Sequence, residues 1–183
     1  RAVEARVAPP FYRRTLTLTP SDATRDELLQ LGFRPERTIA IPNGVDHDFQ
    51  PGGERAAVPT IVCVGRLAPV KRQDQLIEAE VVAKQRVPDL QVVIVGEGPL
   101  RPELEAAIHQ HDAGRWITLA GRLSRAELVS LYQQAWLVTS ASLAEGWGLT
   151  LAEAAALLIF EKKVRAIWDA DADAPSRSSN AAR

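Results

Sequence analysis

The sequence has one cysteine, no methionine and no long apolar run, and each shortage excludes a class of protein. The single cysteine, Cys63, rules out an internal disulfide framework and any metal site built from several cysteines, and it is typical of a reducing cytoplasm. Its neighbours Ile61, Val62 and Val64 favour a buried strand residue over a reactive thiol. Because no apolar stretch approaches the ~20 residues that cross a bilayer, we expect a soluble, cytoplasmic protein.

The sequence also lacks an excess of charge of either sign. The 22 basic and 23 acidic side chains give a formal net charge of −1, which argues against a nucleic-acid-binding surface. The length of 183 residues fits one domain and part of another. Methionine is missing even at position 1, and the start at Arg1 lacks the apolar stretch of a signal peptide. Either processing or a start inside a longer reading frame would explain the missing methionine, and we expect the second.

Short apolar runs alternate with amphipathic stretches of helical length. Strands are predicted at 60–65, 91–96, 116–120 and 136–140, each followed by a helix, near 73–86, near 101–112, from 124 and from about 149. Ser124 and Glu127 form a capping-box pattern at the start of the third helix. This alternation predicts an α/β fold, a Rossmann-like parallel sheet with helices on both faces.

The chain divides into four segments. A strand at 15–19, a helix at 22–31 with Ser21 as N-cap, and a strand at 38–41 suggest that residues 1–46 are the end of a preceding domain. Residues 47–59 are rich in proline and glycine and are predicted to be an interdomain linker. Residues 60–156 form the main, partial domain. The polar and Ala/Ser-rich segment 157–183 departs from the pattern, and we expect it to be a disordered tail.

Ligands of such sheets bind beyond the carboxyl ends of the strands, and three loops there are suitably built. Gly65-Arg66-Leu67 and Lys71 combine a glycine with two cations that could hold a diphosphate, although solvated surface cations would give the same pattern. The turn Gly96-Glu97-Gly98-Pro99 is a weaker signal, because any short strand-to-helix connection can use these residues. It also lacks the spaced glycines of a dinucleotide fingerprint, which argues against a dehydrogenase.

The strongest signal is Glu145-Gly-Trp-Gly-Leu-Thr-Leu-Ala-Glu153, in which two carboxylates are eight residues apart across a strand-to-helix loop. Gly146 and Gly148 leave backbone N–H groups approachable, the helix N-terminus favours an anionic diphosphate, and the carboxylates can accept hydrogen bonds from sugar hydroxyls. The alternative for Glu153 is structural, since Thr150-Leu-Ala-Glu153 is itself a capping-box pattern.

The order and spacing of five motifs over residues 15–156 resemble glycosyltransferase family 4. These motifs are Pro42-Asn-Gly-Val-Asp46, Val64-Gly-Arg-Leu67 with Lys71, Val95-Gly-Glu-Gly-Pro99, Ala120-Gly-Arg-Leu123 and Glu145-Gly-Trp-Gly-Leu149 through Glu153. Enzymes of this family have two Rossmann-like domains (the GT-B fold), retain the anomeric configuration and need no metal. The resemblance implies that this chain is mainly the second, donor-binding domain, and that it is incomplete.

The resemblance also implies roles for individual residues. Arg66 and Lys71 would hold the donor diphosphate and stabilise its charge as the glycosidic bond breaks, and Glu145 would contact the donor sugar, so these three are the expected catalytic residues. Glu153 would accept hydrogen bonds from the ribose, and Leu123 would lie against the base. The remaining expected donor-binding residues are Gly65, Gly98, Gly146, Trp147, Gly148 and Leu149.

The sequence also departs from the family. The acceptor domain with its active-site histidine is missing, and His47, His109 and His111 do not replace it. We therefore expect a fragment that binds a nucleotide sugar, needs no cofactor or metal, and is inactive alone toward an unknown acceptor. Alternatives are a non-catalytic nucleotide-binding remnant and a sugar-nucleotide epimerase. Further expectations are self-association through an unpaired sheet edge and, as in some relatives, peripheral contact with a membrane.

Overall fold

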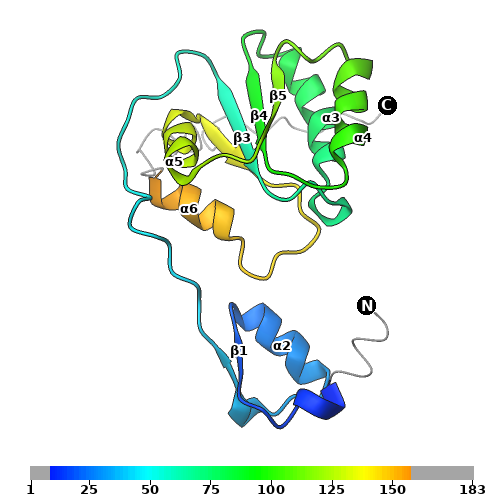
Figure 1. Cartoon of the computed structure of the whole chain (residues 1–183), viewed down its shortest axis with the longest axis vertical. Coiled ribbons are helices and arrows are strands. Elements are labelled where there is room, and N and C mark those ends of the chain that lie inside the picture. The colour runs from blue at the N-terminus through cyan, green and yellow to red at the C-terminus, as the bar shows by residue number, and fades with distance from the viewer. Residues whose placement is uncertain (1–8, 158–183) are drawn as a thin grey trace, which may run out of the picture.

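A four-stranded parallel sheet is the centre of the larger of two units in the computed structural model, which describes residues 9–157 (Figure 1). Its strands are β3 (Thr60–Val64), β4 (Gln91–Val95), β5 (Ile117–Gly121) and β6 (Leu137–Thr139). They lie in the order β5-β4-β3-β6, and every neighbouring pair is parallel. The first three strands extend the sheet in one direction, whereas β6 returns to the other side of β3. This reversal is the topological switch point at which sheets of this kind bind ligands.

The two central strands consist almost entirely of β-branched residues and are buried on both faces. In β3, the successive residues Val62 and Cys63 point to opposite faces, and both are buried. Apolar strands without polar alternation are typical of parallel sheets, because helices cover both of their faces. The sequence of β3 therefore requires a core on each side of the sheet.

Helices provide these two cores. Helices α3 (Gln73–Lys84) and α4 (Arg101–Gln110) cover one face, where Cys63, Ile77 and Leu104 belong to one apolar cluster. Helices α5 (Arg125–Gln134) and α6 (Leu149–Leu157) cover the other face, where Val62 and Tyr132 belong to a second cluster. The fold class expected from the sequence, a parallel sheet with helices on both faces, is confirmed.

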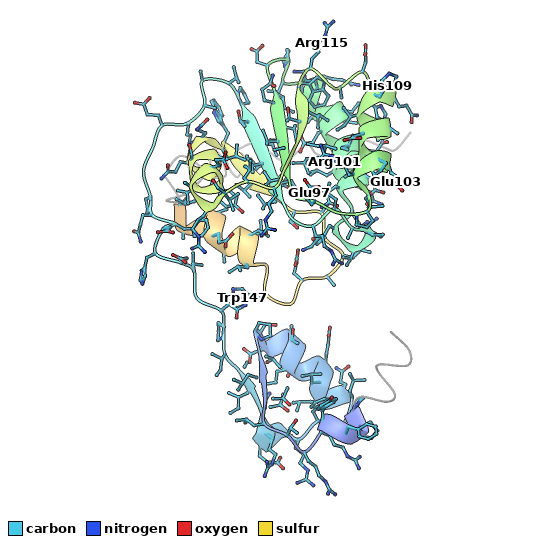
Figure 2. All side chains as sticks on the ribbon, viewed as in Figure 1. Glu97, Arg101, Glu103, His109, Arg115 and Trp147 are labelled. Atoms are coloured by element: carbon cyan, nitrogen blue, oxygen red, sulfur yellow. The ribbon has the colours of Figure 1, made fainter. Side chains whose placement is uncertain are left out.

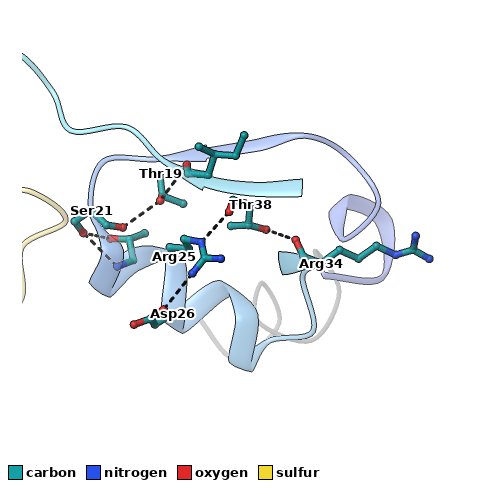
Figure 3. A network of polar contacts seen from close by, with 8 residues as sticks. Thr19, Ser21, Arg25, Asp26, Arg34 and Thr38 are labelled. Atoms are coloured by element: carbon teal, nitrogen blue, oxygen red, sulfur yellow. Dashed lines mark hydrogen bonds and ion pairs between the residues drawn. The ribbon is translucent and has the colours of Figure 1, made fainter. Parts of the chain in front are cut away.

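Residues 15–41 form a smaller unit next to the main sheet (Figure 1). Strands β1 (Thr17–Thr19) and β2 (Thr38–Ala40) are parallel, and α2 (Asp22–Gln30) and the short 3₁₀ helix η1 (Pro35–Arg37) connect them. Figure 3 shows the polar contacts that hold this unit: Arg25 Nε donates to the Thr38 carbonyl at 2.8 Å, and Thr38 Oγ1 donates to the Arg34 carbonyl at 2.9 Å. As predicted, Ser21 caps α2 by accepting a hydrogen bond from the Thr24 amide.

The segment from 46 to 56 lacks helices and strands but packs along α5. Arg125 pairs with Asp46, and the Phe49 ring is buried against Tyr132 with the ring centroids 6.2 Å apart. Farther along, the Ala56 amide donates to the Gln134 carbonyl at 2.9 Å. This part of the expected linker 47–59 is thus anchored to the main unit. The division into domains stays a prediction.

The predicted elements occur where the sequence placed them, with ends that differ by at most two residues. The capping box of Ser124 and Glu127 is present at α5. Within residues 9–157, β6 pairs only with β3 and is an edge strand, and its residue Leu137 is half exposed. Self-association through this edge stays a prediction. The expected tail 157–183 lies, apart from Leu157, outside the described residues. No helix of the described part is both long and apolar enough to span a membrane.

Candidate functional site

Two loops meet at the switch point beyond the carboxyl ends of β3 and β6. The first runs from Gly65 through the 3₁₀ helix η2 (Pro69–Lys71), and the second runs from Ser140 to Gly148. The Leu143 amide donates to the Val70 carbonyl at 2.9 Å and ties one loop to the other. Residues that are some 70 positions apart in the sequence therefore share one edge of the sheet.

The strongest polar contact between these loops joins Lys71 and Glu145. Lys71 Nζ lies 2.5 Å from Glu145 Oε1, and the two side chains are 24% and 31% exposed. Burial acts to raise the pKa of Glu145, but hydrogen bonds from Lys71 and Ser142 together with the Lys71 charge outweigh it and hold this pKa below the usual glutamate value. The structure thus brings together two of the three expected catalytic residues as an ion pair, in which Glu145 stays ionised at neutral pH.

The third expected catalytic residue, Arg66, lies at the start of the same loop as Lys71, and its side chain is exposed. Its backbone carbonyl accepts a hydrogen bond from Gln73 Nε2 at 3.0 Å. Gly65 precedes it at the end of β3, where its amide donates to the Val95 carbonyl at 3.0 Å. Among the described residues, no ion pair involves the Arg66 guanidinium, which is free to meet an anion.

The loop after β4 leans on the loop after β3. A Cβ at Gly96 would lie 2.0 Å from the Gly65 carbonyl oxygen, and one at Gly98 would lie 2.2 Å from the Leu67 carbonyl oxygen. The Leu67 amide in turn donates to the Glu97 carbonyl at 2.9 Å. This close approach of two backbones is a structural reason for glycine at Gly98, which the sequence suggested as a donor-binding residue.

The N-terminus of α6 is the next part of the site. Gly148 has φ +72° and turns the chain into the helix, which begins at Leu149. Thr150 is therefore the second helical residue and does not occupy the N-cap position, so the capping-box alternative for Glu153 is wrong. Burial raises the pKa of Glu153, while the charges of Arg125 and Asp46 act on it in opposite directions. Glu153 remains a carboxylate without a structural role in capping.

Trp147 and Gly146 lie where the loop after β6 meets the smaller unit, and Figure 2 shows Trp147 at this junction. Thr24 Oγ1 lies 3.5 Å from the Gly146 carbonyl, and a Cβ at Gly146 would lie 3.7 Å from the Pro20 ring. The Trp147 indole N–H is buried and has no hydrogen-bond partner among the described residues. The loop that carries Glu145 thus contacts α2 of the smaller unit.

Leu123 lies apart from the ion pair, in the loop after β5. It is half buried and lines a surface hollow of about 490 Å³ together with Val93, Ala126, Glu127, Ser130, Leu131 and Gln134. The hollow is formed by α5 and the sheet and contains several apolar side chains. Such a surface is suited to a flat ring.

Two residues of the site were missed by reasoning from sequence. Tyr132 is fully buried and donates through its hydroxyl to the Thr150 carbonyl at 3.1 Å, which fixes the first turn of α6. Gln73 is 1% exposed and holds the Arg66 turn. A polar group at a core-facing position of a helix was the available signal in both cases. In the described part of the chain, no group of three or more His, Cys, Asp or Glu side chains could hold a metal ion.

Known proteins resemble this chain in sequence and in fold. The Alpha-monoglucosyldiacylglycerol synthase of Acholeplasma laidlawii is 30% identical over 147 residues, which are 80% of this chain and 31% of that protein. The pneumococcal O-GlcNAc transferase GtfA, solved in complex with UDP and GlcNAc, is 27% identical with a TM-score of 0.64. The match covers 75% of this chain and 27% of the GtfA chain. Anabaena Alr3699/HepE, solved with UDP and glucose, has a TM-score of 0.73 at 23% identity over 84% of this chain and 46% of its own, a likeness of fold.

The match therefore covers most of this chain, but the chain spans less than half the length of each of these proteins. Residues 45–159 match the family model described as Glycosyl transferases group 1, and this segment contains every expected donor-site residue. The chain belongs to the group 1 glycosyl transferases.

Proposed function

We propose that this chain supplies the donor side of a retaining family 4 glycosyltransferase, which transfers a sugar from a uridine diphosphate donor to an acceptor. The observation that carries the proposal is the meeting of Lys71 and Glu145 at the switch point of the sheet, 2.5 Å apart. The choice of uridine rests on relatives, because both GtfA and HepE were solved with UDP.

The proposed chemistry assigns one task to each part of the site. Arg66 and Lys71 neutralise the diphosphate as it leaves, assisted by the backbone amides of Gly148 and Leu149 at the start of α6. Glu145 accepts hydrogen bonds from the donor sugar, and the carboxylate of Glu153 accepts from the ribose. The bond between the anomeric carbon and the UDP oxygen breaks and leaves an oxocarbenium-like sugar. An acceptor hydroxyl attacks from the face that UDP leaves and gives its proton to the departing phosphate, so that the anomeric configuration is retained. We propose that none of these steps needs a metal or cofactor.

Leu123, Gly98 and Trp147 have supporting roles in this proposal. The base lies against Leu123, whose hollow of about 490 Å³ is large enough for one aromatic ring system. Gly98 acts through the backbone that it holds beside Leu67. Trp147 orders the loop that presents Glu145.

Calorimetric titration of the purified chain tests the donor site. UDP, GDP, ADP and their glucose or N-acetylglucosamine conjugates are compared, and Arg66→Ala and Glu153→Ala are measured beside the matched variants Arg115→Ala and Glu103→Ala. The controls are exposed and lie away from the switch point, Arg115 before β5 and Glu103 on α4. Saturable binding that prefers UDP and falls about tenfold in the first two variants only is the expected result. A folded chain that binds none of these nucleotides would sink the proposal.

Catalysis is tested separately from binding. UDP release from a UDP-sugar is followed with and without added acceptor, and the anomeric configuration of any product is determined by NMR. A retained configuration supports the transferase. Binding without any release would favour the non-catalytic nucleotide-binding module, and an altered sugar still attached to UDP would favour an epimerase.

A further inference from the structure

An amide occupies a position in α3 where a helix of this kind has an apolar side chain. The buried residues of α3 are Gln73, Leu76, Ile77 and Glu80, which form one core-facing stripe with the spacing i, i+3, i+4 and i+7. Leu76 and Ile77 belong to the apolar cluster under the sheet, whereas Gln73 at the start of the helix is 1% exposed. Burial of a carboxamide costs free energy unless hydrogen bonds compensate for the lost contact with water.

The compensating contact is made to the loop from Gly65 to Lys71, which carries the two cations of the proposed donor site. Gln73 Nε2 donates to the Arg66 carbonyl at 3.0 Å, and a Cβ at Gly65 would lie 3.9 Å from the same nitrogen. Gln73 Oε1 is buried and has no partner among residues 9–157, so half of the amide is buried at a net cost. The contact with the turn around Arg66, and not the fit to the core, therefore accounts for an amide at this position.

The hydrogen bond of Gln73 connects the two ends of the loop between β3 and α3. The loop that begins at Gly65 carries Arg66 near its start and Lys71 at its end, and Arg72 with φ +51° turns the chain into α3. The hydrogen bond of the first helical residue returns to the Arg66 carbonyl and joins the end of the loop to its beginning. One amide thus ties the backbone at Arg66 to the start of α3, directly after Lys71 and Arg72.

We infer that Gln73 is a positioning residue of the donor site: its buried carboxamide holds the turn around Arg66 in the conformation that accepts the donor diphosphate. This inference rests on the proposed function for its ligand. The geometry itself is a property of the ligand-free chain. The two parts can therefore be tested by different measurements.

The variant Gln73→Met removes the donor and keeps the size of the side chain, and Gln75→Met is the matched control because Gln75 is exposed on the same helix. Amide hydrogen exchange of the segment 64–68 is measured without ligand. The Leu67 amide reports on it directly, through its hydrogen bond to the Glu97 carbonyl. We expect about tenfold faster exchange and about tenfold weaker UDP binding in Gln73→Met, the effect of one lost buried hydrogen bond, and no change in Gln75→Met.

Gln73→Glu is the second variant and covers the case in which Gln73→Met does not fold. A protonated carboxyl can donate to the Arg66 carbonyl as the amide does, whereas a carboxylate cannot. Exchange in this variant should approach the wild-type rate at pH 5 and exceed it at pH 8, after correction for intrinsic exchange. Because a carboxylate buried at this position also destabilises the chain as a whole, the positioning role predicts that exchange rises with pH more in the segment 64–68 than across the rest of α3.

Three outcomes decide the matter. Unchanged exchange in Gln73→Met, or a pH-independent rate in Gln73→Glu, overturns the positioning role itself. Faster exchange with unchanged UDP affinity overturns the link between the turn and the diphosphate. A wild-type chain that does not bind UDP overturns the proposed function, which is a distinct result because the exchange measurement uses no nucleotide.

Discussion

Replacing Glu145 by glutamine should tighten the binding of UDP while it slows sugar transfer. In the ligand-free chain, Glu145 Oε1 pairs with Lys71 Nζ at 2.5 Å. The proposed site needs the same Lys71 cation to bind the diphosphate. UDP must therefore compete with an internal anion. The variant Glu145→Gln removes this competition and a negative charge close to the phosphates, but it also removes the carboxylate that is proposed to contact the sugar.

The expected magnitude follows from the exposure of the pair. With side chains 24% and 31% exposed, solvent screens the attraction, and such pairs contribute roughly 0.2–1 kcal/mol. UDP should accordingly bind about 1.4-fold to fivefold more tightly to Glu145→Gln. Transfer from a UDP-sugar should be about tenfold slower, because a neutral amide accepts a weaker hydrogen bond than a carboxylate.

Titration calorimetry with UDP, at low and moderate salt, measures the gain in affinity. Because the pKa of Glu145 is held low, the carboxylate stays ionised at neutral pH, and the ratio of the two affinities should be constant between pH 6 and 8. The ratio should approach one only when the pH falls through the lowered pKa of the folded protein, where the ion pair is lost. Glu103→Gln on α4 is the control for loss of a remote charge.

Weaker UDP binding by Glu145→Gln would refute this reasoning. It would mean that Glu145 holds Lys71 in the orientation that the diphosphate needs, so that the ion pair prepares the site and does not compete with the ligand. An unchanged affinity would show that Lys71 does not contact the diphosphate.

Three further predictions concern stability, measured by urea unfolding. Burial raises the pKa of Glu80, so its charge opposes folding at neutral pH: wild-type stability should rise as the pH falls from 7 toward 5, and Glu80→Gln should add about 1 kcal/mol at pH 7 and less at pH 5. Gly96→Ala should cost about 3 kcal/mol and abolish UDP binding, because its Cβ would meet the Gly65 carbonyl at 2.0 Å; wild-type stability in this variant would contradict the close approach. Phe49→Ala should cost about 3 kcal/mol through loss of its contact with Tyr132, whereas a detached linker would tolerate it without effect.

The sequence predicted what local patterns determine. Strand β4 begins at Gln91 as expected, because four consecutive β-branched residues, 92–95, come shortly after the turn residues Pro88 and Asp89. The start of α5 was predicted because the hydroxyl and carboxylate of its capping box are three residues apart, a contact that needs no other part of the fold. The order of strands and loops then placed Lys71 and Glu145 at one edge of the sheet.

Contacts between distant segments were not predictable in the same way. Lys71 and Glu145 were assigned to one site, but their ion pair depends on the register between β3 and β6. The capping alternative for Glu153 had a correct spacing and failed because α6 begins after Gly148, two residues earlier than that alternative requires. The burial of Phe49 in a segment rich in proline and glycine depends on its packing against Tyr132 of α5, a distant contact that no local pattern predicts.

The strand order β5-β4-β3-β6 places the helices that follow the two halves of the site on opposite faces of the sheet. Lys71 is supported by the apolar cluster on the face of α3 and α4, and Glu145 precedes a helix that is supported by the cluster on the face of α5 and α6. The hydrogen bond from the Leu143 amide to the Val70 carbonyl and the pair of Lys71 and Glu145 nevertheless join the two loops above the sheet. A change in either core can therefore reach the donor site, and laboratory selection for a new donor sugar should accumulate changes on both faces of the sheet.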